Sequence, residues 1–314
     1  YWTNMEENRM RKLRKEMIAI ITVVMVLLAG CGSSALPKVP FYATMRTGHS
    51  GTLEMLYYDT NTYGYKGENR DMQKYAIVYV PYGYDAGRQY DVLFLMHGMG
   101  GSAARFLGTP DDPREDKVMI DNLIRNGKME PMIIVGISYY PDNQEDDNDD
   151  YDAALTKNFG TELRNDLLPA VEARYSVYKD REHRAFGGFS MGAVTTWYRM
   201  CDSMDLFSKY IAMSGSLYWG ADDHARNDPA GYITNAIQSE GYGKDDFQVW
   251  AATGSDDFAN DTMVRQMESL KQTDLFDFSD TGNTTWHIGD GEKHNSHATT
   301  RYLYTALPAL FPAE

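Results

Sequence analysis

The chain has 314 residues, of which 43% are hydrophobic and 13% aromatic, and its formal net charge is −15. This composition is typical of a globular protein and excludes an intrinsically disordered chain. The acidic balance argues against nucleic-acid binding, which needs clustered Lys and Arg on a basic domain. Two cysteines, Cys31 and Cys201, are too few to predict a disulfide framework.

The N-terminal segment has the pattern of an export signal. A basic stretch from Arg9 to Lys15 precedes the apolar run MIAIITVVMVLLAG, residues 17–30. The run is shorter than the roughly 20 residues that span a bilayer, but it suits the hydrophobic region of a secretory signal peptide. It ends in Leu28-Ala-Gly-Cys31, which resembles the lipobox of bacterial lipoproteins. That resemblance implies cleavage before Cys31 and a lipid on its sulfur; a plain signal peptide with a coincidental cysteine is the alternative.

These features divide the chain into three expected parts. Residues 1–30 are expected to be a lipoprotein-type signal peptide. Met10 is a more natural start of translation than Tyr1, so we expect residues 1–9 to be upstream sequence. Residues 31–51 contain the lipidated cysteine, a short tether and the entry to the domain. Residues 52–314 form one exported domain, anchored at the cell surface or in the periplasm.

From about residue 52 onward, β-rich runs alternate with amphipathic ones, which predicts an α/β fold with a mostly parallel sheet and covering helices. Several runs are nearly continuously apolar, as expected of strands buried on both faces. The predicted strands are 75–80, 91–98, 132–137, 184–190, 210–215, 247–254 and 284–289. The predicted helices are 161–175, the segment after Ser190, a segment near 258–271, and 298–310. Pro169 makes the first of these helices less regular.

The segment PDNQEDDNDDYDA, residues 141–153, is the one acidic run of the chain. Its spacing does not match the twelve-residue calcium loop, which has a central glycine and a terminal glutamate. We therefore expect a solvated loop there and no metal site.

The stretch GGFSMGA, residues 187–193, contains the pattern G-x-S-x-G around Ser190. A strand is predicted before this serine and a helix after it, which is the context of a nucleophile elbow. Such a strand-to-helix turn requires small residues two positions before and two after the nucleophile, and Gly188 and Gly192 satisfy this requirement. The pattern alone is weak evidence, so the partners of the serine have to support it.

A serine nucleophile needs a base to accept its proton and a carboxylate to orient that base. On α/β-hydrolase folds these residues follow in the order Ser, Asp, His, on loops after later strands. The strand 247–254 leads into Asp256 and Asp257, and the strand 284–289 leads into His294 and His297. The order predicts an α/β-hydrolase, but the residues themselves do not separate the two aspartates or the two histidines. His287 is expected to lie within its strand.

Acyl transfer also requires backbone donors for the oxyanion. One is expected from Met191, the residue after the nucleophile, and the second from the glycine-rich loop HGMGG that follows the strand beginning at residue 91. We assign the second donor to the N–H of Met99, with Gly100 as a neighbour that shares the role. His97 is expected to orient this loop rather than to act in catalysis.

Two aromatic residues, Tyr218 and Trp219 in the segment SGSLYWG, follow a predicted strand at the same edge of the sheet. They are candidates for a wall of the acyl or leaving-group pocket. Cys201, on the helix after Ser190, is expected to be a small buried residue.

Four blocks of the chain resemble the esterase D-like α/β-hydrolases, specifically the feruloyl and acetyl-xylan esterases of carbohydrate esterase family 1. They are VYVPYGYDAGRQYDVLFLMHGMGGS, FGTELRNDLLPAVEARYSVYKDREHRAFGGFSMGA, AATGSDDFA and HNSHATTRYLYTALPALF, and they are spread over most of residues 52–312. The resemblance implies that the carboxylate is Asp257, the fourth position of the family's Gly-Thr/Ser-x-Asp pattern. It also implies that the base is His294, eight residues before Tyr302. The chain departs from the family after His294, where many relatives have an aromatic residue, and this leaves His297 as an alternative.

The resemblance implies a serine esterase that forms an acyl-enzyme and needs no cofactor or metal. Its expected substrate is a feruloylated or acetylated plant polysaccharide of the xylan type, with release of ferulate or a related hydroxycinnamate. Removal of acetyl groups from xylan is the close alternative. Two further readings are a surface-binding lipoprotein that has lost catalysis, and an enzyme that transfers the acyl group to a sugar.

Overall fold

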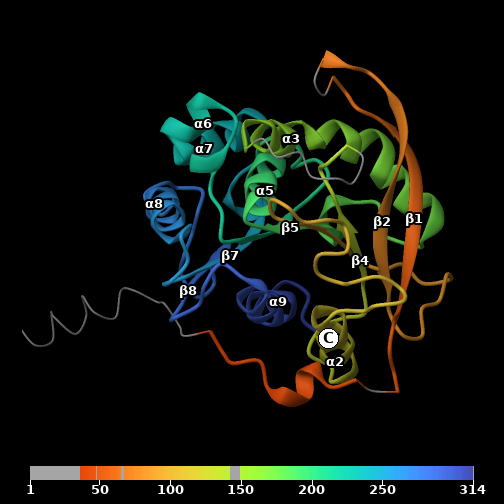
Figure 1. Ribbon diagram of the computed structural model, residues 1–314. Helices are drawn as coiled ribbons and strands as arrows, with labels where there is room; N and C mark the ends of the chain where they lie inside the picture. The colour runs from red at the N-terminus through yellow and green to blue at the C-terminus, as the bar shows by residue number, and fades with distance from the viewer. Residues whose placement is uncertain (1–35, 47, 65–66, 142–148, 314) are drawn as a thin grey trace, which may run out of the picture. The chain divides into compact units, whose positions relative to one another are not determined.

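The computed structural model describes residues 36–46, 48–64, 67–141 and 149–313. In this part of the chain, eight strands form one sheet in the order β1-β2-β4-β3-β5-β6-β7-β8 (Figure 1). From β4 to β8 neighbouring strands are parallel, whereas β1 and β2 are antiparallel additions at one edge. The expected mostly parallel α/β-hydrolase sheet is confirmed. The strands are Thr52–Asn61 (β1), Asp71–Val80 (β2), Val92–Met96 (β3), Ile133–Ile137 (β4), Arg184–Phe189 (β5), Lys209–Met213 (β6), Gln248–Gly254 (β7) and Thr284–Gly289 (β8).

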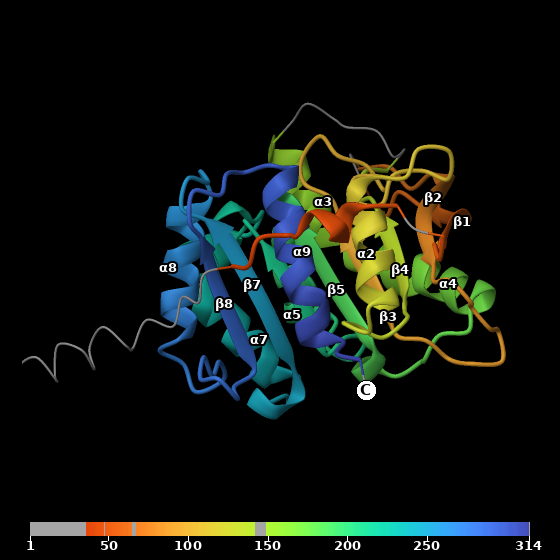
Figure 2. The same cartoon turned by 90° about the horizontal axis from the view of Figure 1, so that it is seen from below.

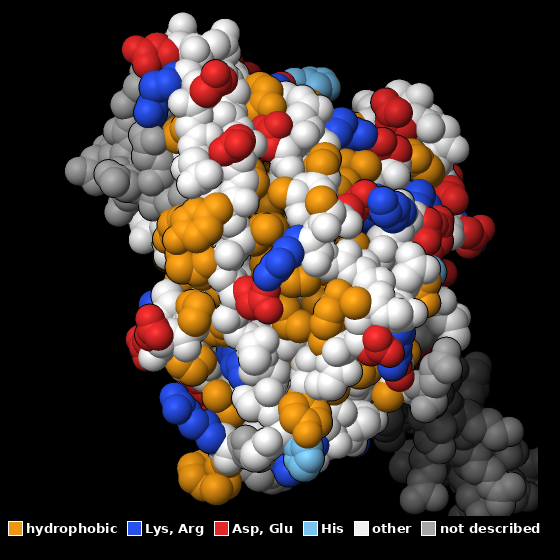
Figure 3. Space-filling view, turned by 90° about the vertical axis from the view of Figure 1, so that its right-hand side faces the viewer, with side chains coloured by type: hydrophobic (Ala, Val, Ile, Leu, Met, Phe, Trp, Pro, Cys, Tyr) orange, Lys and Arg blue, Asp and Glu red, His pale blue; other side chains and the backbone are white. Residues whose placement is uncertain are grey.

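The edge strand β1 was not among the predicted strands, and β2 begins four residues earlier than its apolar run. The ten residues of β1 pair with β2 along its whole length, from Thr52 opposite Val80 to Asn61 opposite Asp71. Buried and exposed side chains alternate along β1 because one of its faces meets solvent. A search for continuous apolar runs misses such a strand. Figure 3 shows the side of the molecule on which β1 and β2 lie, with hydrophobic side chains in patches between charged ones.

Helices cover both faces of the sheet, and alternate residues of each central strand point to opposite faces. Val92, Phe94 and Met96 of β3 belong to one hydrophobic core, and Leu93 and Leu95 belong to the other. The second core lies under α2 (Glu115–Arg125) and α9 (Ser296–Leu310), which lie side by side in Figure 2. The first core lies under α3 (Asp149–Glu162), α4 (Leu168–Arg174), α5 (Met191–Asp202), α7 (Pro229–Ser239) and α8 (Asn260–Leu270), with the short α6 (Asp223–Asn227) beside α7.

The predicted helix 161–175 is the second half of a longer helical stretch with a π-helical segment, Leu163–Leu167, in its middle. Pro169 follows this segment, has no N–H, and would clash with the carbonyl four residues earlier in a regular helix. The wider π turn, in which Leu168 N–H donates to Leu163 O, accommodates it. The stretch also begins earlier than expected, because α3 starts at Asp149 within the predicted acidic loop. Residues 142–148 of that loop lie outside the described residues.

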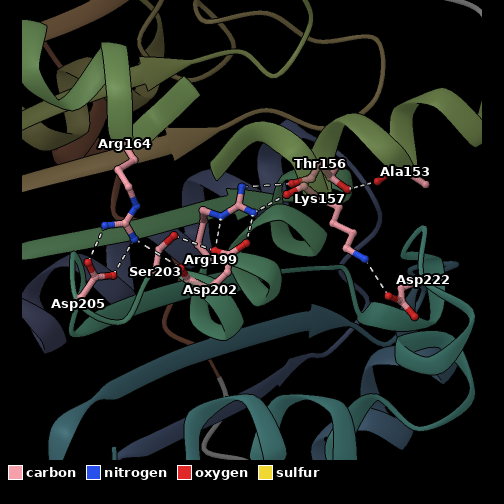
Figure 4. Close-up of polar contacts among 9 residues, drawn as sticks. All are labelled: Ala153, Thr156, Lys157, Arg164, Arg199, Asp202, Ser203, Asp205 and Asp222. Carbon is pink, nitrogen blue, oxygen red and sulfur yellow. Dashed lines mark hydrogen bonds and ion pairs between the residues drawn. The ribbon is translucent and has the colours of Figure 1, made fainter. Parts of the chain in front are cut away.

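Ion pairs and hydrogen bonds fasten α3 to α5 and to the loop before α6 (Figure 4). The guanidinium of Arg199, which is fully buried, donates to the carbonyls of Thr156 and Lys157 and pairs with Asp202. The ammonium of Lys157 pairs with Asp222 at 2.7 Å. These contacts fix α5, the helix that follows Ser190, and the segment just after Trp219.

The first described residues are held against α9. Leu36 is buried, and Arg301 donates to the carbonyls of Leu36 and Pro37 and also pairs with Glu292. Glu292 lies in the loop that precedes His294. Through Arg301, the first described residues therefore help to hold that loop. The expected signal peptide and Cys31 lie outside the described residues, within which no helix is long and apolar enough to cross a membrane.

Candidate active site

Ser190 lies on a sharp turn between β5 and α5. Its backbone has φ +59° and ψ −120°, a left-handed conformation that is rare for a residue with a side chain and costs about 1–3 kcal/mol. Close packing enforces the turn, since a Cβ on Gly188 would lie 2.4 Å from the carbonyl carbon of Gly192. A Cβ on Gly192 would lie 2.1 Å from Met96 O. The Ser190 N–H also donates to Met213 O at 2.8 Å. The turn therefore holds the serine at the carboxyl edge of the parallel strands.

His294 and Asp257 meet at the same edge, from the loops after β8 and β7. His294 Nδ1 lies 2.8 Å from Asp257 Oδ1, and this oxygen also accepts from the N–H of Ala259 at 2.8 Å. The imidazole is packed between the rings of Phe189 and Phe258, with centroid distances of 4.3 and 4.1 Å. With Nδ1–H donated to the carboxylate, Nε2 is the nitrogen left to accept a proton.

The structure thus brings Ser190, His294 and Asp257 together and leaves the alternatives outside. Asp256 is exposed, and His297 is exposed in the first turn of α9. His287 lies within β8, as expected, with its ring 5.4 Å from that of Trp250. The geometry agrees with the assignment to Asp257 and His294 that the family resemblance implies.

The glycine-rich loop after β3 passes directly beside the nucleophile, since a Cβ on Gly98 would lie 2.9 Å from Ser190 Cβ. His97 is fully buried, and its Nδ1 lies 2.6 Å from Gly98 O while its Nε2 lies 2.8 Å from Ser138 Oγ. Burial lowers its pKa to about 4, so the ring is neutral near pH 7 and orients the loop.

The backbone N–H groups near Ser190 differ in whether they already donate a hydrogen bond. The Gly100 N–H donates to Tyr140 Oη at 3.0 Å, so it is not free to share the oxyanion role that we expected. Among the described residues, no hydrogen bond uses the N–H of Met99 or of Met191. Both donors are therefore available beside Ser190, and their role in binding an oxyanion stays a prediction.

Two recesses meet at Ser190 and His294. One, of about 320 Å³, is apolar and is lined mainly by Met191, Val194, Trp219, Phe258 and Ala259. The other, of about 270 Å³, is lined by the glycines of the 98–101 loop together with Arg105, Phe189, Asn295 and Ser296.

Of the two aromatic residues that we expected to form a pocket wall, Trp219 lines a recess and Tyr218 does not. Trp219 lines the apolar recess, with 49% of its surface exposed, and its indole N–H donates to Thr262 at 3.2 Å. Tyr218 does not line the recess, because its ring lies under the guanidinium of Arg265 at 4.5 Å. Phe258 and Tyr140 were missed in the sequence; the position of Phe258 directly after Asp257 was the available signal. Within the described ranges, no group of three or more His, Cys, Asp or Glu side chains is arranged to hold a metal ion.

Comparisons with known proteins agree with this geometry. A family model described as "Putative esterase" matches residues 69–287. Endo-1,4-beta-xylanase Y of Acetivibrio thermocellus is 34% identical over 247 residues, which are 74% of this chain but 21% of that protein. The chain therefore spans about a fifth of the length of this curated relative.

Two solved structures are similar over most of both chains. A structure named FAE has a TM-score of 0.74 at 30% identity and covers 89% of this chain and 94% of that chain. A serine-to-alanine mutant of the feruloyl esterase module from Clostridium thermocellum, complexed with sinapinate, has a TM-score of 0.73 at 29% identity with the same coverage.

We predict that Ser190→Ala lowers the rate of ester hydrolysis by at least about 10⁴-fold, because the nucleophile is lost. His294→Ala is expected to have a comparable effect, whereas His297→Ala changes the rate by less than about threefold because that side chain is exposed. Initial rates of the three purified variants provide the measurement. Equal losses at the two histidines would overturn the assignment of His294.

We predict that Tyr140→Phe lowers kcat by roughly 3- to 10-fold with little change in KM, because it frees Gly100 N–H and loosens the loop that presents Met99. Tyr57→Phe removes an exposed hydroxyl on β1 and is the matched control. Steady-state kinetics and thermal unfolding of both variants separate this positioning role from a general loss of stability. An unchanged kcat in Tyr140→Phe would show that the Tyr140 contact does not position the loop.

Proposed function

This chain belongs to the putative esterase family, and on that premise we propose that it releases ferulate or a related hydroxycinnamate from plant cell-wall polysaccharide. The reaction is a serine-dependent hydrolysis of a carboxylic ester through an acyl-enzyme. The similar structure that is named as a feruloyl esterase module, with bound sinapinate, supports this substrate class.

The observation on which the proposal rests is the apolar recess beside Ser190. Its volume of about 320 Å³ lies at the lower end of the range for small-molecule pockets. Trp219 and Phe258 supply aromatic surface, and Met191 and Val194 supply aliphatic surface, which suits a planar phenylpropenoyl group. An acetyl group would leave most of this recess unfilled, so the recess favours the larger aromatic acyl group.

The geometry supports the following course of reaction. Ser190 Oγ attacks the ester carbonyl carbon while Nε2 of His294 takes the hydroxyl proton, and Asp257 stabilises the imidazolium through Nδ1. The N–H groups of Met191 and Met99 donate to the carbonyl oxygen as it becomes negative. The bond to the alcohol then breaks, and the alcohol leaves with the proton from His294. Water repeats the sequence on the acyl-enzyme and releases the free acid and Ser190.

We also propose that the enzyme is exported and held at a membrane by a lipid on Cys31. Support comes from the basic and apolar pattern of residues 9–30 and from the Leu-Ala-Gly-Cys sequence that ends it. A polymeric substrate outside the cell is consistent with this location.

We predict that the soluble chain from residue 32 hydrolyses methyl ferulate and that Ser190→Ala does not. The test compares release of ferulate from methyl ferulate with release of acetate from acetylated xylan, by chromatography of the products. Acetate release without ferulate release would contradict the proposal and identify a deacetylase. If neither ester is cleaved by the native chain, the family scaffold serves another purpose here.

We predict that Cys31→Ser moves the enzyme from the membrane fraction to the soluble fraction of expressing bacterial cells, and that it abolishes incorporation of radiolabelled palmitate. Cys201→Ser is the matched control, because this cysteine lies on α5 inside the domain. Palmitate incorporation that survives in Cys31→Ser would refute the lipid anchor at this position.

A further inference from the structure

The recess on the other side of Ser190 differs from the apolar one in its chemistry. Arg105, Asn295 and Ser296 supply polar side chains to it, and residues 98–101 supply backbone. An ester has an acyl part and an alcohol part on opposite sides of its carbonyl carbon. Where the apolar recess takes the acyl part, the polar recess is the place that remains for the alcohol.

Arg105 is the charged group of this recess. Its guanidinium carbon lies 5.9 Å from the ring centroid of Phe189 and 5.6 Å from that of Phe106, and the side chain is only partly exposed. In the part of the chain that the structure describes, its guanidinium makes no hydrogen bond or ion pair. The two rings hold the group in place but leave its N–H donors available to a ligand.

The charged neighbours of Arg105 act on it without forming an ion pair with its guanidinium. Asp116 is the carboxyl group that acts on it most directly, but this side chain is buried and accepts a hydrogen bond from Thr300 at 2.5 Å. Burial raises the pKa of Asp116 to about 6, so the carboxyl is ionised at pH 7 and loses its charge only in more acidic solution. Arg114 adds a second positive charge nearby. Glu115 adds a negative charge beside Asp116. Among the residues that line the recess, Arg105 is nevertheless the one with a permanent charge, and its donors point to no carboxylate of the described chain.

We propose that the Arg105 recess binds the sugar alcohol of the ester and selects alcohols that bear a carboxylate, such as a uronic acid residue next to the ester. A guanidinium that makes no direct ion pair and is partly withdrawn from water binds a carboxylate by two parallel hydrogen bonds more strongly than a neutral hydroxyl. Asn295 and Ser296 also line this recess. The Oδ1 of Asn295 accepts from the N–H of Ala298, so we expect its amide NH2 and the Ser296 hydroxyl to contact the remaining hydroxyls of the sugar. This inference rests on the proposed function, because it assigns the acyl group to the apolar recess.

The test uses two feruloyl esters that differ in one group: methyl glucuronoside feruloylated at one hydroxyl, and methyl glucoside feruloylated at the same hydroxyl. Methyl ferulate serves as the ester without a sugar. For the native enzyme we expect kcat/KM to be about 10- to 100-fold higher on the glucuronoside than on the glucoside. We also expect this preference to fall by severalfold between about 20 and 500 mM salt, because ion pairing is screened.

The variant Arg105→Gln is expected to reduce the preference for the glucuronoside to less than about threefold. Arg125→Gln, which removes the same charge from an exposed position at the end of α2, should keep the native preference. Thermal unfolding of both variants checks that they are folded, and the salt dependence of the native enzyme tests the inference without any substitution.

Three outcomes would overturn the inference: equal rates of the native enzyme on the two sugar esters, a preference that salt does not change, or equal loss on all three esters in Arg105→Gln. The last would indicate that Arg105 acts on the carbonyl rather than on the sugar. Failure of the native enzyme to cleave methyl ferulate would instead refute the proposed function, so the two failures are distinguishable.

Discussion

The strained turn at Ser190 is the constraint on which the rest of the site depends. A non-glycine residue at φ +59° is held there because β5, α5 and the loop after β6 approach so closely that only glycine fits around it. A Cβ on Gly215, for instance, would lie 2.3 Å from Ser190 O. This packing fixes the nucleophile before substrate arrives, so no further free energy is needed to position it during the reaction.

The other parts of the site are fixed by polar contacts rather than by strain. His97 and Tyr140 hold the glycine-rich loop by hydrogen bonds to the backbone of Gly98 and Gly100. His294 is held by a contact with the Asp257 carboxylate and by packing against the rings of Phe189 and Phe258. Ser190 and His294 thus lie between an apolar recess and a recess that contains Arg105, which we assign to the acyl part and the alcohol part of the ester.

Much of this arrangement could be predicted from the sequence, because local patterns determine it. Apolar runs predicted the parallel strands, and Gly188 and Gly192 predicted the sharp turn at Ser190. The order of Ser190 and its two partner loops predicted a catalytic triad, but the choice of residue within each loop needed a family resemblance. The edge strand β1 was not predictable in this way, since it depends on pairing with β2. The start of α3 lies in an acidic stretch that lacks the apolar pattern of a helix. The roles of Tyr140 and Arg105 were not predictable either, because only tertiary contacts bring these residues to the site.

A crystal structure of Ser190→Ala with bound ferulate would test the central claim most directly. The account predicts that the aromatic ring of ferulate lies in the apolar recess against Trp219 and Phe258, with its carboxylate directed at position 190 and at the N–H groups of Met191 and Met99. A ring bound instead beside Arg105 and Asn295 would contradict the account, because it would exchange the acyl and alcohol sides of the site.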